Sequence, residues 1–145
     1  MAFRLDPLLR LRKSEEDRLQ RELGTIQTHL SNQERELGGM QDAEHRNQEE
    51  LAARQGEPLA PDTFILYDRY LQALRGHQDR QRLIISEVQS KAESRRGALI
   101  LAMQKRRSLE ILKERELLRQ RRERLKRETA ILDEVAAGQW FMRNR

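Results

Sequence analysis

The fold of this chain is decided by the stretch "RQGEPLAPDT", which runs from Arg54 to Thr63. It holds Gly56, Pro58 and Pro61, and a proline in a helix interior removes a hydrogen bond and clashes with the preceding turn. No further proline follows in the sequence. The stretch therefore predicts a loop over residues 55–61 that joins two long helices.

The same rules place the outer ends of the two helices. Asp6 followed by Pro7 fits a capping residue with proline at the first helical position. Asp62 can cap the second helix, and Gly138 fits its C-terminal stop. The predicted layout is a first helix over about residues 7–54, a loop over 55–61, a second helix over about 62–137 and a tail over 138–145.

Apolar residues recur at alternating three- and four-residue spacing along both predicted helices, which is the pattern of a coiled-coil seam. The apolar members are Leu5, Leu9, Leu19, Leu23, Ile26, Leu30, Leu37, Met40 and Leu51, then Phe64, Tyr67, Leu71, Leu74, Ile85, Val88, Ala92, Leu99, Ala102 and Leu109. The polar members are Arg12, Glu16, Gln33, Glu44, Asn47, Gln78 and Gln81. The fold class is therefore all-α, an antiparallel coiled-coil hairpin in a single elongated domain over residues 1–145.

The two predicted helices differ in length. Pairing through the loop sets opposite each other residues whose numbers sum to about 117, so the first helix ends beside residue 110 or so. The second helix then continues alone for about 27 residues, and a lone helix of that length gains most of its stability by packing. Its apolar row moves to Ile111, Leu118, Leu125 and Leu132. We therefore expect the second helix to overhang the first and to dock on another protein.

The middle of the predicted coil is its weak point. Pairing through the loop puts Gly38 and Gly39 beside Gly76 and Gln78. Each interior glycine costs a helix up to about 1 kcal/mol relative to alanine. Two interpretations stay open here, a passive bend and a functional hinge.

The composition limits the classes of function that this chain can have. The chain has 37% charged residues, 4% aromatic residues and no cysteine, which leaves little for a globular core and excludes disulfides. No apolar run is long enough for a bilayer span or a secretion signal. His29, His45 and His77 lack metal-ligand spacing and no phosphate-binding glycine loop occurs, so we expect no catalytic residue, metal or cofactor. These features indicate a cytoplasmic protein that is not an enzyme.

Basic residues concentrate in "LKERELLRQRRERLKRETAILDEVA", Leu112 to Ala136, and the formal charge of +5 arises entirely in the last third of the chain. Such a run can neutralise nucleic-acid phosphates. Against this, acids interleave with it, with Glu116 to Arg119 and Glu123 to Arg127 at helix-pairing distance, and aromatic stacking residues are absent from it. Three interpretations stay open: a helix that docks on a protein, which we favour, a solvated helix with internal ion pairs, and a nucleic-acid-binding arm.

A second candidate surface lies on the second helix, where Tyr70, Leu74, His77 and Gln81 follow one another at helical spacing. Tyr70 and His77 fall off the seam, so this strip should be partly exposed beside the coil. It fits either a contact surface or the ordinary flank of a coiled coil.

Three pieces of the sequence resemble the FliJ family of flagellar type III export proteins. They are the opening "FRLDPLLRLRKSEED", the start of the second helix "YDRYLQAL", and the C-terminal "RRSLEILKERELLRQRRERLKRETAILDEVA". With the hairpin layout they cover nearly the whole chain. The resemblance implies a cytoplasmic stalk similar to the gamma subunit of rotary ATPases. It also implies peripheral association with the membrane-embedded export apparatus through protein contacts, without membrane insertion or nucleic acid.

The resemblance further implies three kinds of partner: the hexameric export ATPase (FliI), the export gate protein (FlhA), and the ATPase regulator with escort chaperones. Gate contact maps onto the strip Tyr70, Leu74, His77 and Gln81. For the ATPase ring the resemblance implies only a region. Within it the pattern favours Leu118, Leu125, Ile131 and Leu132 as anchors, with Arg121, Arg122 and Arg124 meeting acidic surface. The alternatives are the equivalent stalk of a virulence-type injectisome and a basic coiled-coil nucleic-acid-binding protein.

Overall fold

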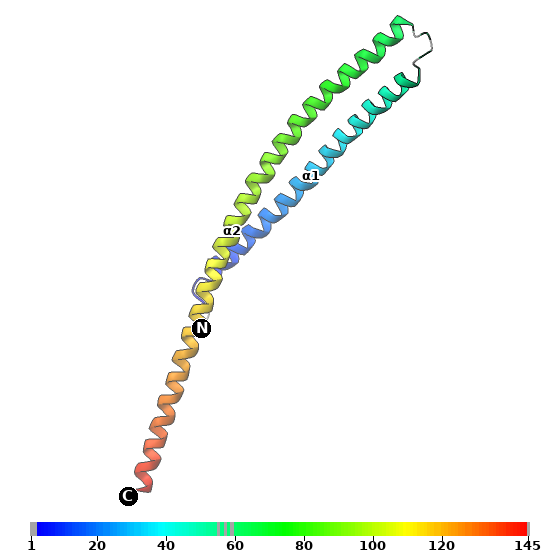
Figure 1. The fold of residues 1–145 in the computed structure, drawn as a ribbon. Helices are drawn as coiled ribbons and strands as arrows, with labels where there is room; N and C mark the ends of the chain where they lie inside the picture. The colour runs from blue at the N-terminus through cyan, green and yellow to red at the C-terminus, as the bar shows by residue number, and fades with distance from the viewer. Residues whose placement is uncertain (1–2, 55, 57, 59, 145) are drawn as a thin grey trace. The chain divides into compact units, whose positions relative to one another are not determined.

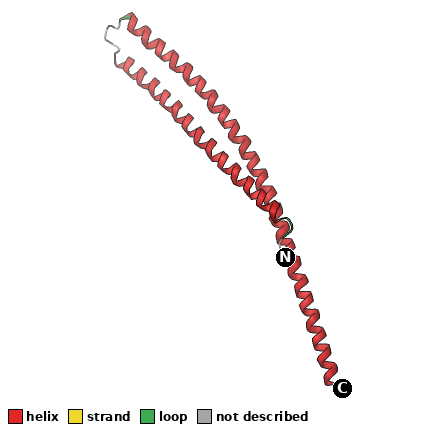
Figure 2. Cartoon of the chain, turned by 180° about the vertical axis from the view of Figure 1, so that it is seen from behind, coloured by secondary structure: helices red, strands yellow, loops and turns green. Residues whose placement is uncertain are grey.

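A computed structural model describes residues 3–54, 56, 58 and 60–144, and within them the chain forms two long helices (Figure 1). Helix α1 spans Asp6–Ala53 and helix α2 spans Pro61–Arg143. No strand occurs in the part of the chain that is described (Figure 2). The predicted all-α class is confirmed, while residues 55, 57, 59 and 145 of the predicted loop and tail lie outside the described residues.

Helix α2 begins one residue before its predicted start. The backbone N–H groups of Thr63 and Phe64 both donate to the carbonyl oxygen of Ala60, at 3.0 and 3.3 Å. Ala60 therefore occupies the capping position that the sequence assigned to Asp62. Pro61 becomes the first helical residue, where its missing N–H leaves no hydrogen bond unmade. Asp62 still stabilises the helix start, because an acid in the first turn interacts favourably with the helix dipole.

The predicted stop at Gly138 is wrong. Helix α2 continues through this glycine to Arg143, so most of the predicted tail is helical. A glycine stop requires the left-handed backbone conformation, and among the described residues only Gly56, with φ at 107°, has a positive φ. An interior glycine costs only about 1 kcal/mol relative to alanine, and no proline follows to end the helix.

The chain divides into two compact units, Arg18–Leu99 and a second that joins Met1–Asp17 to Ile100–Arg145. Within Arg18–Leu99 the two helices run antiparallel. Arg95 Nε lies 3.5 Å from Glu22 Oε2, and Arg75 Nε lies 3.1 Å from Glu44 Oε1. The numbers rise along one helix as they fall along the other, as the predicted hairpin requires.

The second unit shows the same antiparallel pairing. Arg106 bonds to Glu16 of α1 and also to Glu110 one turn further along α2, the latter at 2.7 Å. Lys113 Nζ lies 2.9 Å from Asp6 Oδ1, where α1 begins. The start of α1 therefore lies close to the position on α2 that the pairing rule predicted. The single-domain layout over residues 1–145 stays a prediction.

The core is a narrow seam in each unit. Among the described residues, every apolar side chain that is buried belongs to the predicted seam. These residues are Leu9, Leu19, Leu23, Ile85, Val88, Ala92, Ala102 and Leu109. The buried polar residues Asn47, Gln78 and Gln81 were also predicted members.

Two of these polar residues are hydrogen-bonded across the Arg18–Leu99 unit. Gln81 Nε2 donates to the backbone oxygen of Gln33 at 2.9 Å and to its side-chain oxygen at 2.7 Å. Gln78 Nε2 donates to Glu44 Oε2 at 2.8 Å, and this bond, followed by the bond from Arg75, lowers the pKa of the Glu44 carboxyl. These layers fix the register of the coil at some cost in stability.

Candidate functional site

Helix α2 overhangs α1, as predicted. Lys113 contacts Asp6 at the start of α1, and Gln120 is the last residue of α2 that is partly buried. Every described residue from Arg121 to Asn144 is exposed. We call Arg121–Asn144 the overhang; Figure 1 shows it as the orange-to-red end of α2, beyond the start of α1. A helix without a neighbour in its own unit presents all of its faces to a partner.

The apolar residues predicted to anchor a protein partner are exposed on this helix. Their exposed fractions are 48% for Leu118, 56% for Leu125, 59% for Ile131 and 68% for Leu132. A single exposed leucine is ordinary. Leucines repeated every seven residues along a helix with no neighbour form the kind of apolar face that docks into a groove or onto another helix.

Four more apolar residues are exposed toward the end of α2, on several sides of the helix: Val135, Trp140, Phe141 and Met142. The Trp140 and Phe141 rings meet edge to face, with centroids 5.3 Å apart. The sequence left the structure of this segment undecided, because the glycine at position 138 suggested that the helix had already ended. Its helical continuation adds a further turn of apolar surface.

Among the described residues, Arg119 is the last basic residue of α2 that makes an ion pair. Arg119 bonds to Glu116 at 2.6 and 3.1 Å and to Glu123 at 3.1 Å, and its hydrogen bond lowers the pKa of the Glu116 carboxyl. Glu123 pairs with Arg119, and within the described residues it makes no ion pair with Arg127, although their spacing would allow one. Among the described residues, no ion pair involves Arg127 or the predicted site residues, which are Arg121, Arg122 and Arg124. Their charge is available to a partner.

A hollow of about 670 Å³ lies where α1 begins, beside the last partly buried turn of α2. Phe3, Leu5 and Leu112 supply its apolar lining. Its polar lining includes Glu116 and Arg119. Sequence reasoning missed this hollow, although Phe3 and Leu5 immediately before the first helix were a signal for it. Its α2 lining lies on the side of the helix that faces the start of α1, away from the row that begins at Leu118.

The predicted gate strip is only partly on the surface. Tyr70 is 50% exposed, His77 is exposed and accepts a bond from Arg80 Nη2 at 2.8 Å, and Leu74 is half-buried. Gln81 is only 5% exposed and its amide bonds to Gln33, so it lies in the seam and not on the strip. A partner that binds the strip meets Tyr70 and His77 while Gln81 stays inside the coil.

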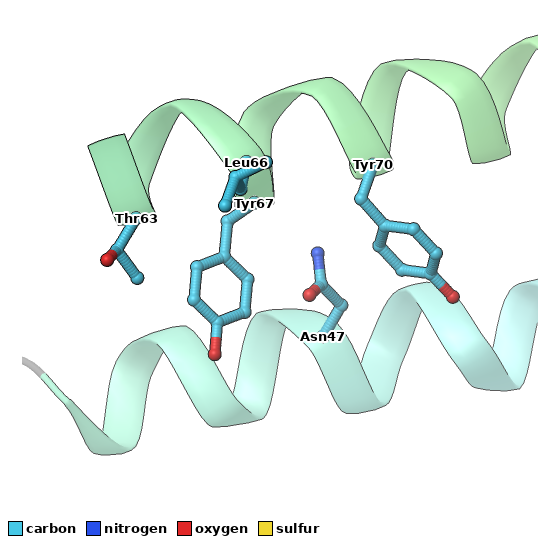
Figure 3. A pocket seen from close by; sticks show the side chains of 5 residues that line it. All are labelled: Asn47, Thr63, Leu66, Tyr67 and Tyr70. Atoms are coloured by element: carbon cyan, nitrogen blue, oxygen red, sulfur yellow. The ribbon is translucent and has the colours of Figure 1, made fainter. Parts of the chain in front are cut away.

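A hollow of about 310 Å³ lies at the loop end of the Arg18–Leu99 unit. Figure 3 shows Tyr67 and Tyr70 pointing from α2 toward α1, with Asn47 of α1 between them. Leu66, which is 67% exposed, also lines the hollow. Phenol rings beside an exposed leucine and a buried amide offer a partner both apolar contact and hydrogen bonds. The sequence could have indicated this hollow, because Phe64, Ile65 and Leu66 are three consecutive apolar residues and only Phe64 belongs to the predicted seam.

Three further features concern chemistry and membranes. Within the described part of the chain, no group of three or more His, Cys, Asp or Glu side chains is placed to hold a metal ion. His45 makes only a local contact, with Nε2 3.0 Å from Glu49 Oε1. None of the described helices has the length and hydropathy of a membrane span.

A family model described as "Flagellar FliJ protein" matches residues 1–145, the whole chain. No curated protein and no solved structure matches it significantly.

Proposed function

The chain belongs to the FliJ family of flagellar proteins, and on that premise we propose that it is a central stalk of flagellar protein export. Membership makes it an export-related component. The proposed role is to couple the hexameric export ATPase (FliI) to the export gate protein (FlhA), without catalysis of its own. The family model is described as flagellar, which favours this system over the related virulence-type injectisome.

The observation that carries the proposal is the overhang. A stalk that enters a ring must present a helix that its own fold leaves uncovered, and residues 121–144 are exposed throughout. In this proposal Leu118, Leu125, Ile131 and Leu132 anchor the helix against apolar surface of the ring. Arg121, Arg122 and Arg124 face acidic groups and mainly steer association. The attraction should therefore weaken with salt.

The gate contact is proposed for the loop end of the Arg18–Leu99 unit. Tyr70, which lines the hollow beside Tyr67, is the best anchor, because a half-exposed aromatic side chain next to a cavity is typical of residues that dominate binding. Leu74 and His77 flank it. Gln81 has only the indirect role of holding the coil together. Escort chaperones and the ATPase regulator are the further expected partners, and all of these contacts would hold the protein at the cytoplasmic side of the export apparatus.

ATP hydrolysis by the cognate export ATPase tests the ring contact. The intact chain should stimulate hydrolysis, and a truncation after Gln120 should not. The sharper comparison is Leu125→Asp with Leu132→Asp against Ala130→Asp with Ala137→Asp. Both pairs add the same charge to the overhang, but the alanines lie on the face opposite the leucines. Equal stimulation by both pairs, or none by the intact chain, would remove the ring from the proposal.

Binding to the purified cytoplasmic part of the gate protein tests the second contact. Tyr70→Ala should weaken binding about tenfold or more if the ring fills a pocket on the partner. Arg69→Ala is the matched control, because Arg69 is an exposed neighbour outside the hollow. If Tyr70→Ala leaves the affinity for the gate protein unchanged, this contact lies elsewhere on the chain.

A nucleic-acid-binding arm is the second candidate function. It is favoured by Arg121, Arg122, Arg124 and Arg127, which make no ion pair among the described residues. Duplex binding whose affinity falls steeply and linearly in log salt would support it. Weak duplex binding beside salt-tolerant ATPase binding would leave the stalk as the better account.

A further inference from the structure

The seam of the Arg18–Leu99 unit is less completely buried in its loop half, which we define as residues 37–53 of α1 and 61–77 of α2. The apolar seam members of the loop half are half-buried or exposed: Leu37, Met40, Leu51, Phe64, Tyr67, Leu71 and Leu74. The buried apolar residues described in this unit all lie outside the loop half: Leu19, Leu23, Ile85, Val88 and Ala92. Two helices therefore leave the seam of the loop half partly open.

Asn47 is the one buried residue among those described in the loop half. It is only 8% exposed, and its side-chain amide makes no hydrogen bond to any described residue. Leaving a buried amide unpaired is costly, so such groups are nearly always hydrogen-bonded in native proteins. The amide of Asn47 therefore calls for a partner.

The other two buried polar residues of the unit show where such a partner comes from. The amide of Gln78 donates to Glu44 at 2.8 Å, and the amide of Gln81 donates to the side-chain oxygen of Gln33 at 2.7 Å. Each is thus satisfied by a side chain of the facing helix. Beside Asn47 the facing helix instead presents the rings of Tyr67 and Tyr70 (Figure 3). A side chain that pairs with Asn47 has to come from outside the hairpin.

Two hollows that share Asn47 and Tyr70 give access to this amide. The hollow of about 310 Å³ is also lined by Leu66 and Tyr67, which makes its wall apolar. The second, of about 350 Å³, is lined by the charged residues Arg46 and Glu50. Neither of these two makes an ion pair within the described part of the chain. An apolar wall beside a charged rim suits a helix that has one apolar and one polar face.

We propose that the loop half binds an amphipathic helix of the gate protein, which packs as a third helix and places an Asn or Gln side chain against Asn47. The inference rests on the proposed gate contact and states the chemistry that the gate protein presents there. A carboxamide can accept a hydrogen bond from Asn47 Nδ2 and donate one to Asn47 Oδ1 at the same time. The backbone amides of a helix are already bonded, so the group comes from a side chain. An apolar residue one turn away covers Leu66 and the tyrosine rings.

Asn47→Leu tests the proposal, because it should separate stability from binding. Leucine is apolar and leaves no amide unpaired, so the midpoint of urea unfolding should not fall. The affinity for the purified cytoplasmic part of the gate protein, measured by calorimetry, should fall at least about tenfold. Asn47→Ala should weaken binding similarly while leaving the hollows open. Gln41→Leu is the matched control, since Gln41 is an exposed amide of α1 outside both hollows, and it should change neither quantity.

The amide can also be observed directly by NMR. The chain has three asparagines, Asn32, Asn47 and Asn144, so isotope-labelled asparagine gives a short list of side-chain signals. The Asn47 signals are those absent from Asn47→Leu. Addition of the gate protein should shift them and leave those of the exposed Asn32 and Asn144 in place. A polar residue that only fixed the register of the coil would show no such shift.

The contrary results separate this inference from the proposed function. A native chain that does not bind the gate protein overturns both. Binding that depends on Tyr70 but is unchanged in Asn47→Leu and Asn47→Ala overturns this inference alone, and water then satisfies the amide. A large loss of stability in Asn47→Leu would show that the amide is paired within the hairpin. On the gate protein, replacing the pairing Asn or Gln with leucine should restore affinity for Asn47→Leu; if no Asn or Gln does so, the stated chemistry is wrong.

Discussion

Replacing Gly38 and Gly39 with alanine should stabilise the Arg18–Leu99 unit. Both glycines lie inside α1, and neither has a positive φ. A Cβ atom built at either position meets no atom within 4 Å, so alanine fits without moving a neighbour. The change therefore isolates the helix preference of the backbone from any effect of packing.

The change in the free energy of unfolding can then be estimated from helix preference alone. Alanine is favoured over glycine in a helix interior by about 0.8–1 kcal/mol per site, and no side-chain contact is gained or lost. The double variant should thus raise the free energy of unfolding by about 1.5–2 kcal/mol. For a chain of this length that raises Tm by about 3–8 °C.

Urea unfolding followed by far-UV circular dichroism measures the effect, and two other glycines calibrate it. Gly24→Ala, also inside α1 with open space around it, should stabilise by about half as much as the double variant. Gly56→Ala should destabilise, because φ at 107° strains any residue with a Cβ. A double variant that lowers stability, or a Gly56→Ala variant that raises it, would refute the reasoning. Full stability with lost ATPase stimulation would identify the glycine pair as a functional hinge.

Three further measurements test the packing and the ion pairs. Gln81→Leu leaves the half-buried side-chain oxygen of Gln33 without its donor and should cost about 1 kcal/mol in urea unfolding, most of which Gln33→Leu in the same chain restores. Leu109→Ala should cost about 2–3 kcal/mol, because Leu109 is 9% exposed and the change leaves a cavity in the seam. Arg106 holds the pKa of the Glu110 carboxyl below its usual range. Their ion pair therefore stabilises the fold fully at a pH above the ordinary Glu pKa of about 4.3. This stabilisation is lost as the pH falls through the lowered pKa of the folded state. An acid titration of thermal stability should accordingly be flatter for Glu110→Gln.

The fold was predictable because its determinants are local and periodic. A single stretch with two prolines sets the turn, and after that the spacing of leucines alone decides which face of each helix is buried. Counting from the loop by the same rule places Gln33 opposite the region of Gln81 to Ile84, which contains its actual partner. Gly138 could not be judged in this way. Whether an isolated glycine ends a helix depends on its backbone conformation, and the sequence of a solvated helix does not determine that conformation.

The candidate site was less predictable because exposure depends on both helices. Tyr70 and Gln81 follow one another at helical spacing, yet one is half-exposed and the other is sealed between α1 and α2. The difference comes from the seam: Gln81 occupies a seam position and Tyr70 lies beside it, because a strip at helical spacing drifts across a seam that repeats every seven residues. The hollow beside Phe3 was missed for a related reason, since its walls are brought together only by the antiparallel pairing.

The row Leu118, Leu125 and Leu132 gives the proposed ring contact its physical basis. Helix α2 exposes these leucines where it has little tertiary support of its own. A partner that covers the row removes apolar surface from water and adds the packing that a lone helix lacks. Leu125→Asp should therefore raise the concentration of ATPase needed for half-maximal binding, while gate binding, which is proposed for the Arg18–Leu99 unit, stays unchanged.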